Sequence, residues 1–118
     1  MEKIRPKKVA DLIKREISSL IPILMRNHSV GFITITHVRM TDDLGIAYVY
    51  FTDMAGIEKA KDSLEKLDEA LGFIRSKLAK HLHLRIVPNL KFFIDDSLSY
   101  ANHIETIIKK IHKDDDHH

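Results

Sequence analysis

Apolar residues recur at every third or fourth position over residues 57–82, and this period constrains the fold more than any other feature of the sequence. The spacing is 3, 4, 3, 4, 3, 4 and 4 along the series Ile57, Ala60, Leu64, Leu67, Leu71, Ile74, Leu78 and Leu82. Such a stripe is typical of an amphipathic helix. Gly72 interrupts the run, and a glycine costs about 1 kcal/mol relative to alanine in a helix interior. We therefore predict two helices that share one apolar face and meet at a kink around Ala70–Gly72.

A second helical stripe lies near the N-terminus. Its members are Val9, Leu12, Ile13, Ile17, Leu20, Ile21 and Leu24. Pro6 suits the first turn of this helix, where a missing N–H costs nothing. Pro22 removes a backbone hydrogen bond and clashes with the preceding turn. We therefore expect the helix to kink or end near Ile21, and we expect a loop from Asn27 to Gly31.

Segments rich in β-branched and aromatic residues predict three strands. The first covers Phe32–Met40, and a slip in its alternation between Ile35 and Val38 indicates a bulge. A short turn leads to the second strand, Ile46–Phe51, so these two strands form an antiparallel hairpin. The third strand covers Leu90–Asp95 and follows the pair of helices.

The order of these elements predicts the fold class. Tyr48 and Tyr50 alternate with apolar residues and therefore share one face of the second strand. The pattern of residues 100–111 predicts a last helix, and the polar tail 112–118 is expected to be disordered. The order α-β-β-α-kink-α-β-α predicts one α+β domain over residues 1–111, with a three-stranded sheet and helices packed on one of its faces.

The composition excludes several classes of function. The 118 residues suit one domain, and the absence of Cys excludes disulfides, thiolate metal sites and Cys nucleophiles. Apolar stretches are too short to span a membrane, so we expect a cytoplasmic protein without a membrane partner. The rings of His81 and His83 point to different sides of a helix, so we expect no metal site and no cofactor. No Ser/His/Asp order and no P-loop supports an enzyme.

The formal net charge of +2 hides an uneven distribution along the chain. Residues 1–40 carry a net +5 and residues 41–72 a net −5. Residues 73–94 contain five Lys and Arg but no Asp or Glu, whereas residues 95–118 carry a net −3. The two positive blocks are therefore the first helix with its N-terminal arm and the segment that follows the kink.

We interpret the two positive blocks as surfaces for RNA phosphates, because a helix N-terminus after a kink also favours anions. The candidate RNA-binding residues are Lys3, Arg5, Lys7, Lys8, Ala70, Gly72, Arg75, Lys77, Lys80 and Arg85. A solvated helix face explains any single lysine better than RNA binding does, and Gly72 could merely cap a helix. Phe73 either stacks on a base or packs beside the kink. Asp68 and Glu69 precede the kink and would repel phosphate there.

The topology resembles the type II K-homology fold, whose members usually clamp nucleic acid with a GxxG loop. This chain has Ala70-Leu71-Gly72 where that loop would be, and this replacement resembles the ribosome-binding factor A family. Further similar segments are Val9-Ala10-Asp11-Leu12-Ile13, Ile33-Thr34-Ile35-Thr36-His37-Val38, Gly72-Phe73-Ile74-Arg75, Leu84-Arg85-Ile86-Val87-Pro88-Asn89-Leu90-Lys91-Phe92 and Asp95-Asp96-Ser97. The resemblance covers roughly residues 5–111. Ala101 stands where the family commonly has Gly, and the loop at residues 27–30 lacks the family's usual Asp-Pro-Arg.

The resemblance implies a factor that binds the small ribosomal subunit and its rRNA. Members of that family assist late maturation and rRNA processing and are linked to growth in the cold. We expect the chain to act as a monomer without a cofactor. The alternative is a non-enzymatic α+β domain that interacts with proteins or dimerises through its sheet edge and does not bind rRNA. Co-sedimentation with purified small subunits would discriminate between the two.

Overall fold

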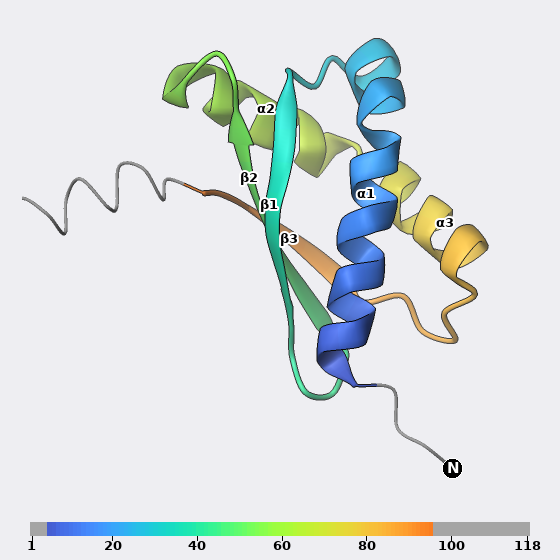
Figure 1. Cartoon of the computed structure of the whole chain (residues 1–118). Coiled ribbons are helices and arrows are strands. Elements are labelled where there is room, and N and C mark those ends of the chain that lie inside the picture. Colours follow the sequence, from blue (N-terminus) through green and yellow to red (C-terminus); the bar gives the residue numbers. More distant parts are fainter. Residues whose placement is uncertain (1–4, 96–118) are drawn as a thin grey trace, which may run out of the picture.

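The computed structural model describes residues 5–95 of the chain. The elements are α1 (Pro6–His28), β1 (Ile33–Met40), β2 (Ile46–Asp53), α2 (Ile57–Glu69), α3 (Leu71–Leu82) and β3 (Asn89–Ile94) (Figure 1). This order confirms the expected α-β-β-α-kink-α-β arrangement. The last helix and the tail expected from residues 100–118 lie outside the described residues, and so does Lys3.

Helix α1 differs from the expectation at its C-terminal end. It passes through Pro22 and continues to His28, so of the two expected outcomes near Ile21, a kink or an end, the end is wrong. Pro22 is exposed, whereas Leu24 in the following turn is fully buried, and this burial stabilises the helix beyond the missing hydrogen bond. Ser29 closes the helix in the left-handed conformation, with φ 59° and its N–H bonded to the carbonyl of Leu24. The loop therefore begins two residues later than expected.

The three strands form one mixed sheet in the order β1-β2-β3. β1 and β2 are antiparallel, and β2 and β3 are parallel because the α2–α3 pair carries the chain back across the sheet. The register of β1 shifts between Ile35 and His37, which confirms the expected bulge. This bulge restores the alternation so that Ile35 and Val38 both face the core.

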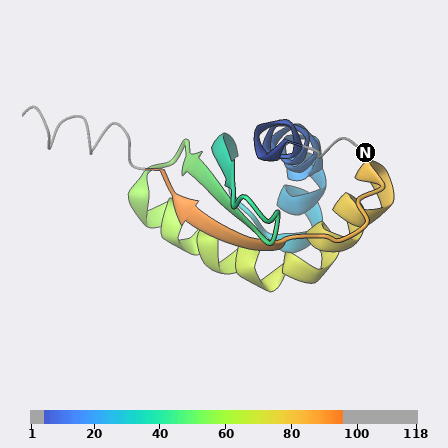
Figure 2. The ribbon, with the colours of Figure 1, turned by 90° about the horizontal axis from the view of Figure 1, so that it is seen from below.

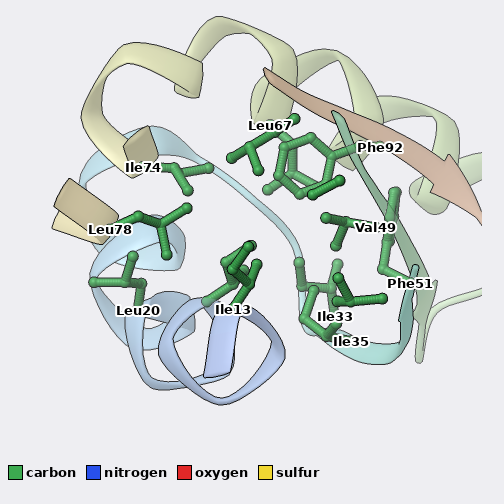
Figure 3. Packing of buried hydrophobic residues seen from close by; sticks show 14 of the residues in the cluster. Ile13, Leu20, Ile33, Ile35, Val49, Phe51, Leu67, Ile74, Leu78 and Phe92 are labelled. Carbon is green, nitrogen blue, oxygen red and sulfur yellow. The ribbon is translucent and has the colours of Figure 1, made fainter. Parts of the chain in front are cut away.

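The hydrophobic core lies between the sheet and the three helices. Alternate residues of every strand are buried, among them Ile35, Val49 and Phe92. α1 packs against β1 and α3, while α2 packs against β2 and β3. Figure 3 shows side chains of the sheet and of the helices, including Ile13 and Leu67, converging in this layer. The helices thus cover one face of the sheet, as expected. Figure 2 shows the same arrangement after a turn of 90°.

The two helices of the kinked pair use the predicted apolar stripe with one exception. Ala60 and Leu67 are buried on α2, and Ile74 and Leu78 are fully buried on α3. Ile57 does not belong to the core, since it is 51% exposed in the first turn of α2. The helix begins there, beyond the end of β2, and so its first turn overhangs the sheet.

The hairpin turn between β1 and β2 is fixed by one carboxylate. Oδ1 of Asp43 accepts hydrogen bonds from Oγ1 of Thr41 at 2.7 Å and from the N–H of Gly45 at 2.9 Å. The hydrogen bond from Thr41 and that from Gly45 hold the pKa of Asp43 below its ordinary value of 3.8. Leu44 in this turn has φ 61°, so a residue with a side chain occupies the left-handed region here.

Two classes of site find no support in the part of the chain that the structure describes. No helix between residues 5 and 95 is both long and apolar enough to cross a membrane. Within that range, no three His, Asp or Glu side chains gather where they could hold a metal ion. Instead, Nδ1 of His81 contacts a carboxylate oxygen of Glu16 and so links α3 to α1.

Candidate nucleic-acid interface

Ala70 forms the junction between α2 and α3. It has φ −93° and ψ 8°, and its N–H lies 3.0 Å from the carbonyls of both Lys66 and Leu67. Its own carbonyl accepts the N–H of Ile74 at 3.0 Å, so the two helices remain connected by hydrogen bonds. The side chain of Ala70 is only 2% exposed and faces the core. The side chain of Ala70 therefore shapes the junction from within, and its expected contact with RNA stays a prediction.

Gly72 leaves the backbone of α3 bare in its first turn. A Cβ placed on Gly72 would meet no atom within 4 Å, and the residue does not adopt a positive φ. Glycine is therefore not required at this position, either by crowding from residues 5–95 or by the backbone conformation. Alanine would be favoured in a helix by about 1 kcal/mol. The start of α3 also lacks a side-chain cap. The first turn of a helix carries a partial positive charge, which favours an approaching anion.

Arg75 lies one turn into α3, but two of its donors are already used. Its Nη2 donates to the carbonyl of Val87 at 3.1 Å, and its Nε donates to that of Pro88 at 3.3 Å. These bonds attach α3 to the segment that leads into β3. Arg75 thus holds the loop in place while its positive charge stays at the surface, where it is exposed.

Phe73 and Lys77 form a small cluster next to the junction. The ring of Phe73 is half-buried and lies 4.7 Å from the ring of His28 at the end of α1. Nζ of Lys77 lies 5.6 Å from the centre of the Phe73 ring. This geometry favours packing of Phe73 beside the kink over base stacking, and it keeps the ammonium group of Lys77 on the α3 surface.

The remaining expected residues lie toward the other end of α3. Lys80 is exposed in the last turn, and α3 has 12 residues, so about 18 Å of helix separates this end from the kink. Arg85 lines a groove together with Val9, which places it next to the start of α1. Arg5, Lys7 and Lys8 are exposed at that start. Lys7 lines a different groove from Arg85, between α1 and β1. Ala70 and Gly72 lie at the kink end of α3.

Acidic side chains border the interface on the α2 side. Asp68 and Glu69 are exposed immediately before the junction. Nζ of Lys66 lies 3.9 Å from Oε2 of Glu69 and offsets part of this charge. The positive surface therefore extends along α3, and its boundary with the acidic helix lies at the kink.

Two cations outside the expected set join Lys7. Lys14 and Arg39 line the same groove between α1 and β1 as Lys7 does. Lys14 follows Lys7 by seven residues, and this spacing places both on one side of a helix. Arg39 lies on a strand position that alternates outward. The sequence thus contained the periodicity that could have identified both residues.

Comparison with known proteins agrees with this architecture. The family model of ribosome-binding factor A matches residues 5–108. A ribosome-binding factor A of Macrococcus caseolyticus is 42% identical over 111 residues, which are 94% of this chain and 97% of that protein. A ribosome-binding factor A of Staphylococcus carnosus is 40% identical over 115 residues, with 98% of this chain and all of that protein covered.

Solved structures show the same fold. The crystal structure of ribosome-binding factor A from Thermus thermophilus has a TM-score of 0.66 and 22% identity, and the match covers 77% of this chain and 97% of that one. A Thermus thermophilus model fitted into the cryo-EM map of a 30S complex has a TM-score of 0.60 and 26% identity, and covers 71% and 88% of the two chains. The kinked helix pair, the mixed sheet and these matches agree, and the chain belongs to the ribosome-binding factor A family.

Proposed function

We propose that the protein binds the small ribosomal subunit through its rRNA and assists late maturation and processing of that RNA. Family membership and the Thermus thermophilus 30S complex support the choice of partner. The observation that carries the proposal is the backbone at Gly72, which no side chain covers. Gly72 directly precedes the segment 73–94, which contains no Asp or Glu. In this proposal the protein acts by binding and catalyses no reaction. It acts as a monomer in the cytoplasm.

The expected contacts are electrostatic. An RNA phosphate approaches the first turn of α3 where Gly72 has no side chain, and the N–H groups there favour its charge. Lys77 and Lys80 lie further along the same helix and supply mobile cations to neighbouring phosphates. Each neutralised phosphate releases counterions, so the affinity should fall as the salt concentration rises.

Co-sedimentation with purified small subunits tests the proposal directly. The variant carries Lys77→Glu and Lys80→Glu, and the matched control carries Lys59→Glu and Lys61→Glu on the acidic helix α2. We expect the α3 variant to bind more weakly and with a flatter salt dependence, because it loses two cations from the interface. The control should bind like the original protein, although its net charge changes by the same amount.

Two results would contradict the proposal. One is an α3 variant with unchanged affinity and salt slope. The other is a protein that does not sediment with small subunits even at low salt, or that dimerises instead. In cells, fractionation of ribosomes should find the protein with free small subunits rather than with assembled ribosomes. Loss of the protein should lead to accumulation of precursor small-subunit rRNA, most clearly during growth in the cold.

A further inference from the structure

The sheet face that the helices leave uncovered carries aromatic rings and cations. Two central rows of its outward-facing residues run across the three strands. One row is Arg39, Tyr48 and Lys91, and the other is His37, Tyr50 and Phe93. We call these six residues the open face. Within residues 5–95, no helix packs against them, because the helices cover the opposite side of the sheet.

The rings of the open face form a continuous run. Tyr50 and Phe93 stack with centroids 5.5 Å apart and an angle of 27° between the rings. Tyr48 lies 6.0 Å from Phe93, and His37 lies 5.9 Å from Tyr50. Cross-strand ring pairs stabilise a sheet by themselves. Phe93 nevertheless remains 41% exposed, and Tyr48 and Tyr50 beside it are half-buried, so each of the three rings keeps some surface in solvent.

Cations surround the rings. The guanidinium carbon of Arg39 lies 4.5 Å from the centre of the Tyr48 ring. His37 and Arg39 also line the groove between α1 and β1. Lys7 and Lys14 line the same groove from α1. Positive charge therefore continues from the first helix, through this groove, onto the sheet.

Two carboxylates limit the positive surface. Asp11 lines the same groove between α1 and β1. Asp95 lies at the end of β3 and accepts a hydrogen bond from Oγ1 of Thr36. The rows of Tyr48 and Tyr50 contain no acid, so the charge of the open face complements a polyanion.

We propose that the open face binds single-stranded RNA, with bases stacked on Tyr48, Tyr50 and Phe93 and with phosphates in the groove between α1 and β1. A basic groove beside exposed rings is the arrangement that binds single strands with little sequence preference, since every base has a π face. The inference rests on the proposed function for its choice of RNA as ligand. It adds a second contact, on the side of the sheet opposite α3.

Binding of a fluorescently labelled oligouridylate of about 12 nucleotides to the full chain, followed by anisotropy, tests the proposal. Tyr50→Ala and Phe93→Ala should each weaken binding by about tenfold, because each removes one stacking surface. Tyr50→Phe and Phe93→Tyr keep the rings and should retain the affinity. Phe32→Ala is the matched control, because Phe32 is 61% exposed but lies outside the open face.

Tyrosine fluorescence provides a second measurement of binding, and it does not require a substitution that could destabilise the fold. The chain has three Tyr and no Trp, so its intrinsic fluorescence comes from tyrosine. Bases stacked on Tyr48 and Tyr50 should quench this fluorescence as RNA is added. The double variant Tyr48→Phe, Tyr50→Phe should lose this quenching but retain its affinity in the anisotropy experiment.

Unchanged affinity in both alanine variants, or RNA binding without tyrosine quenching, would overturn the proposal. A face covered by a second copy or by residues 96–118 would give that result. The two proposals fail separately. Subunit co-sedimentation without oligouridylate binding contradicts only the open face, whereas ring-dependent oligouridylate binding without co-sedimentation contradicts only the subunit as partner.

Discussion

The hydroxyl of Ser63 donates a hydrogen bond to Oδ2 of Asp53 at 2.9 Å and at the same time accepts the N–H of Gly31 at 2.9 Å. Ser63 is 1% exposed and is the buried polar side chain of the described core. Oδ1 of Asp53 accepts the N–H of Ala55 at 2.8 Å. One hydroxyl on α2 thereby joins the loop before β1 to the end of β2, through one accepted and one donated hydrogen bond.

Ser63→Ala should lower the free energy of unfolding by about 1–3 kcal/mol, because it leaves a donor and an acceptor without their partner. Urea unfolding measures the change. Ser18→Ala provides the control, since Ser18 is exposed on α1 and its replacement should alter stability by no more than about 0.5 kcal/mol. Equal stability of the Ser63 variant and the control would show that the network contributes nothing.

Gly72→Ala should separate stability from binding. The new methyl group enters open space, so the helix should gain about 0.5–1 kcal/mol of stability. The same methyl group covers the backbone that we propose for phosphate contact, so co-sedimentation with small subunits should weaken. Thermal unfolding and sedimentation on one preparation check both effects.

Gly31→Ala is the opposite case and serves as a comparison. A Cβ at Gly31 would lie 2.5 Å from Oδ2 of Asp53 and 2.7 Å from Oγ of Ser63, so this change should destabilise the fold. If Gly72→Ala binds subunits as well as the original protein, the bare backbone of α3 has no part in recognition.

Asp43→Asn should make the stability of the protein less dependent on pH in the acidic range. The pKa of Asp43 is lowered in the fold, so its carboxylate contributes stability that is complete above 3.8, the ordinary value, and is lost as the pH falls through the folded value. The stability difference between the original protein and Asp43→Asn should therefore shrink on acidification. NMR titration of the Asp43 carboxyl provides the direct measurement. A difference that grows toward low pH would contradict the assignment.

Arg75→Lys should reveal whether Arg75 acts through its geometry or through its charge. Lysine keeps the charge but cannot donate to the carbonyls of Val87 and Pro88 together, so unfolding free energy should fall by about 1 kcal/mol. Subunit binding should change little under conditions in which the protein stays folded. Arg26→Lys, at an exposed position of α1, should leave stability unchanged. Loss of binding without loss of stability would assign Arg75 to the RNA contact instead.

The sequence predicted the kinked helix pair because two physical signals agreed there. The apolar period continues on both sides of Ala70, while Gly72 marks the place where regular helix is least favoured. Pro22 suggested a possible helix end that does not occur, since the cost of a proline is a local property and the burial of Leu24 is a tertiary one. Ile57 fitted the same period but overhangs the sheet, which no spacing can reveal.

The candidate interface was predictable in charge but not in geometry. Counting acids identified the segment 73–94, yet it could not show that Arg75 bonds two carbonyls or that Ala70 faces the core. Alternation placed Tyr48 and Tyr50 on one face. Only the parallel pairing of β2 with β3 brings Phe93 beside Tyr50, and such a pairing depends on contacts distant in the chain.

That parallel pairing also has a consequence for synthesis. Met40 pairs with Ala47 across a short turn, whereas Ala47 pairs with Leu90 only after both α2 and α3 have been made. Local pairs form faster than distant ones, and a growing chain folds from its N-terminus. A nascent chain on the ribosome should therefore hold a two-stranded hairpin with β2 as an open edge. The third strand can join the sheet only when the residues up to Ile94 have emerged from the ribosome.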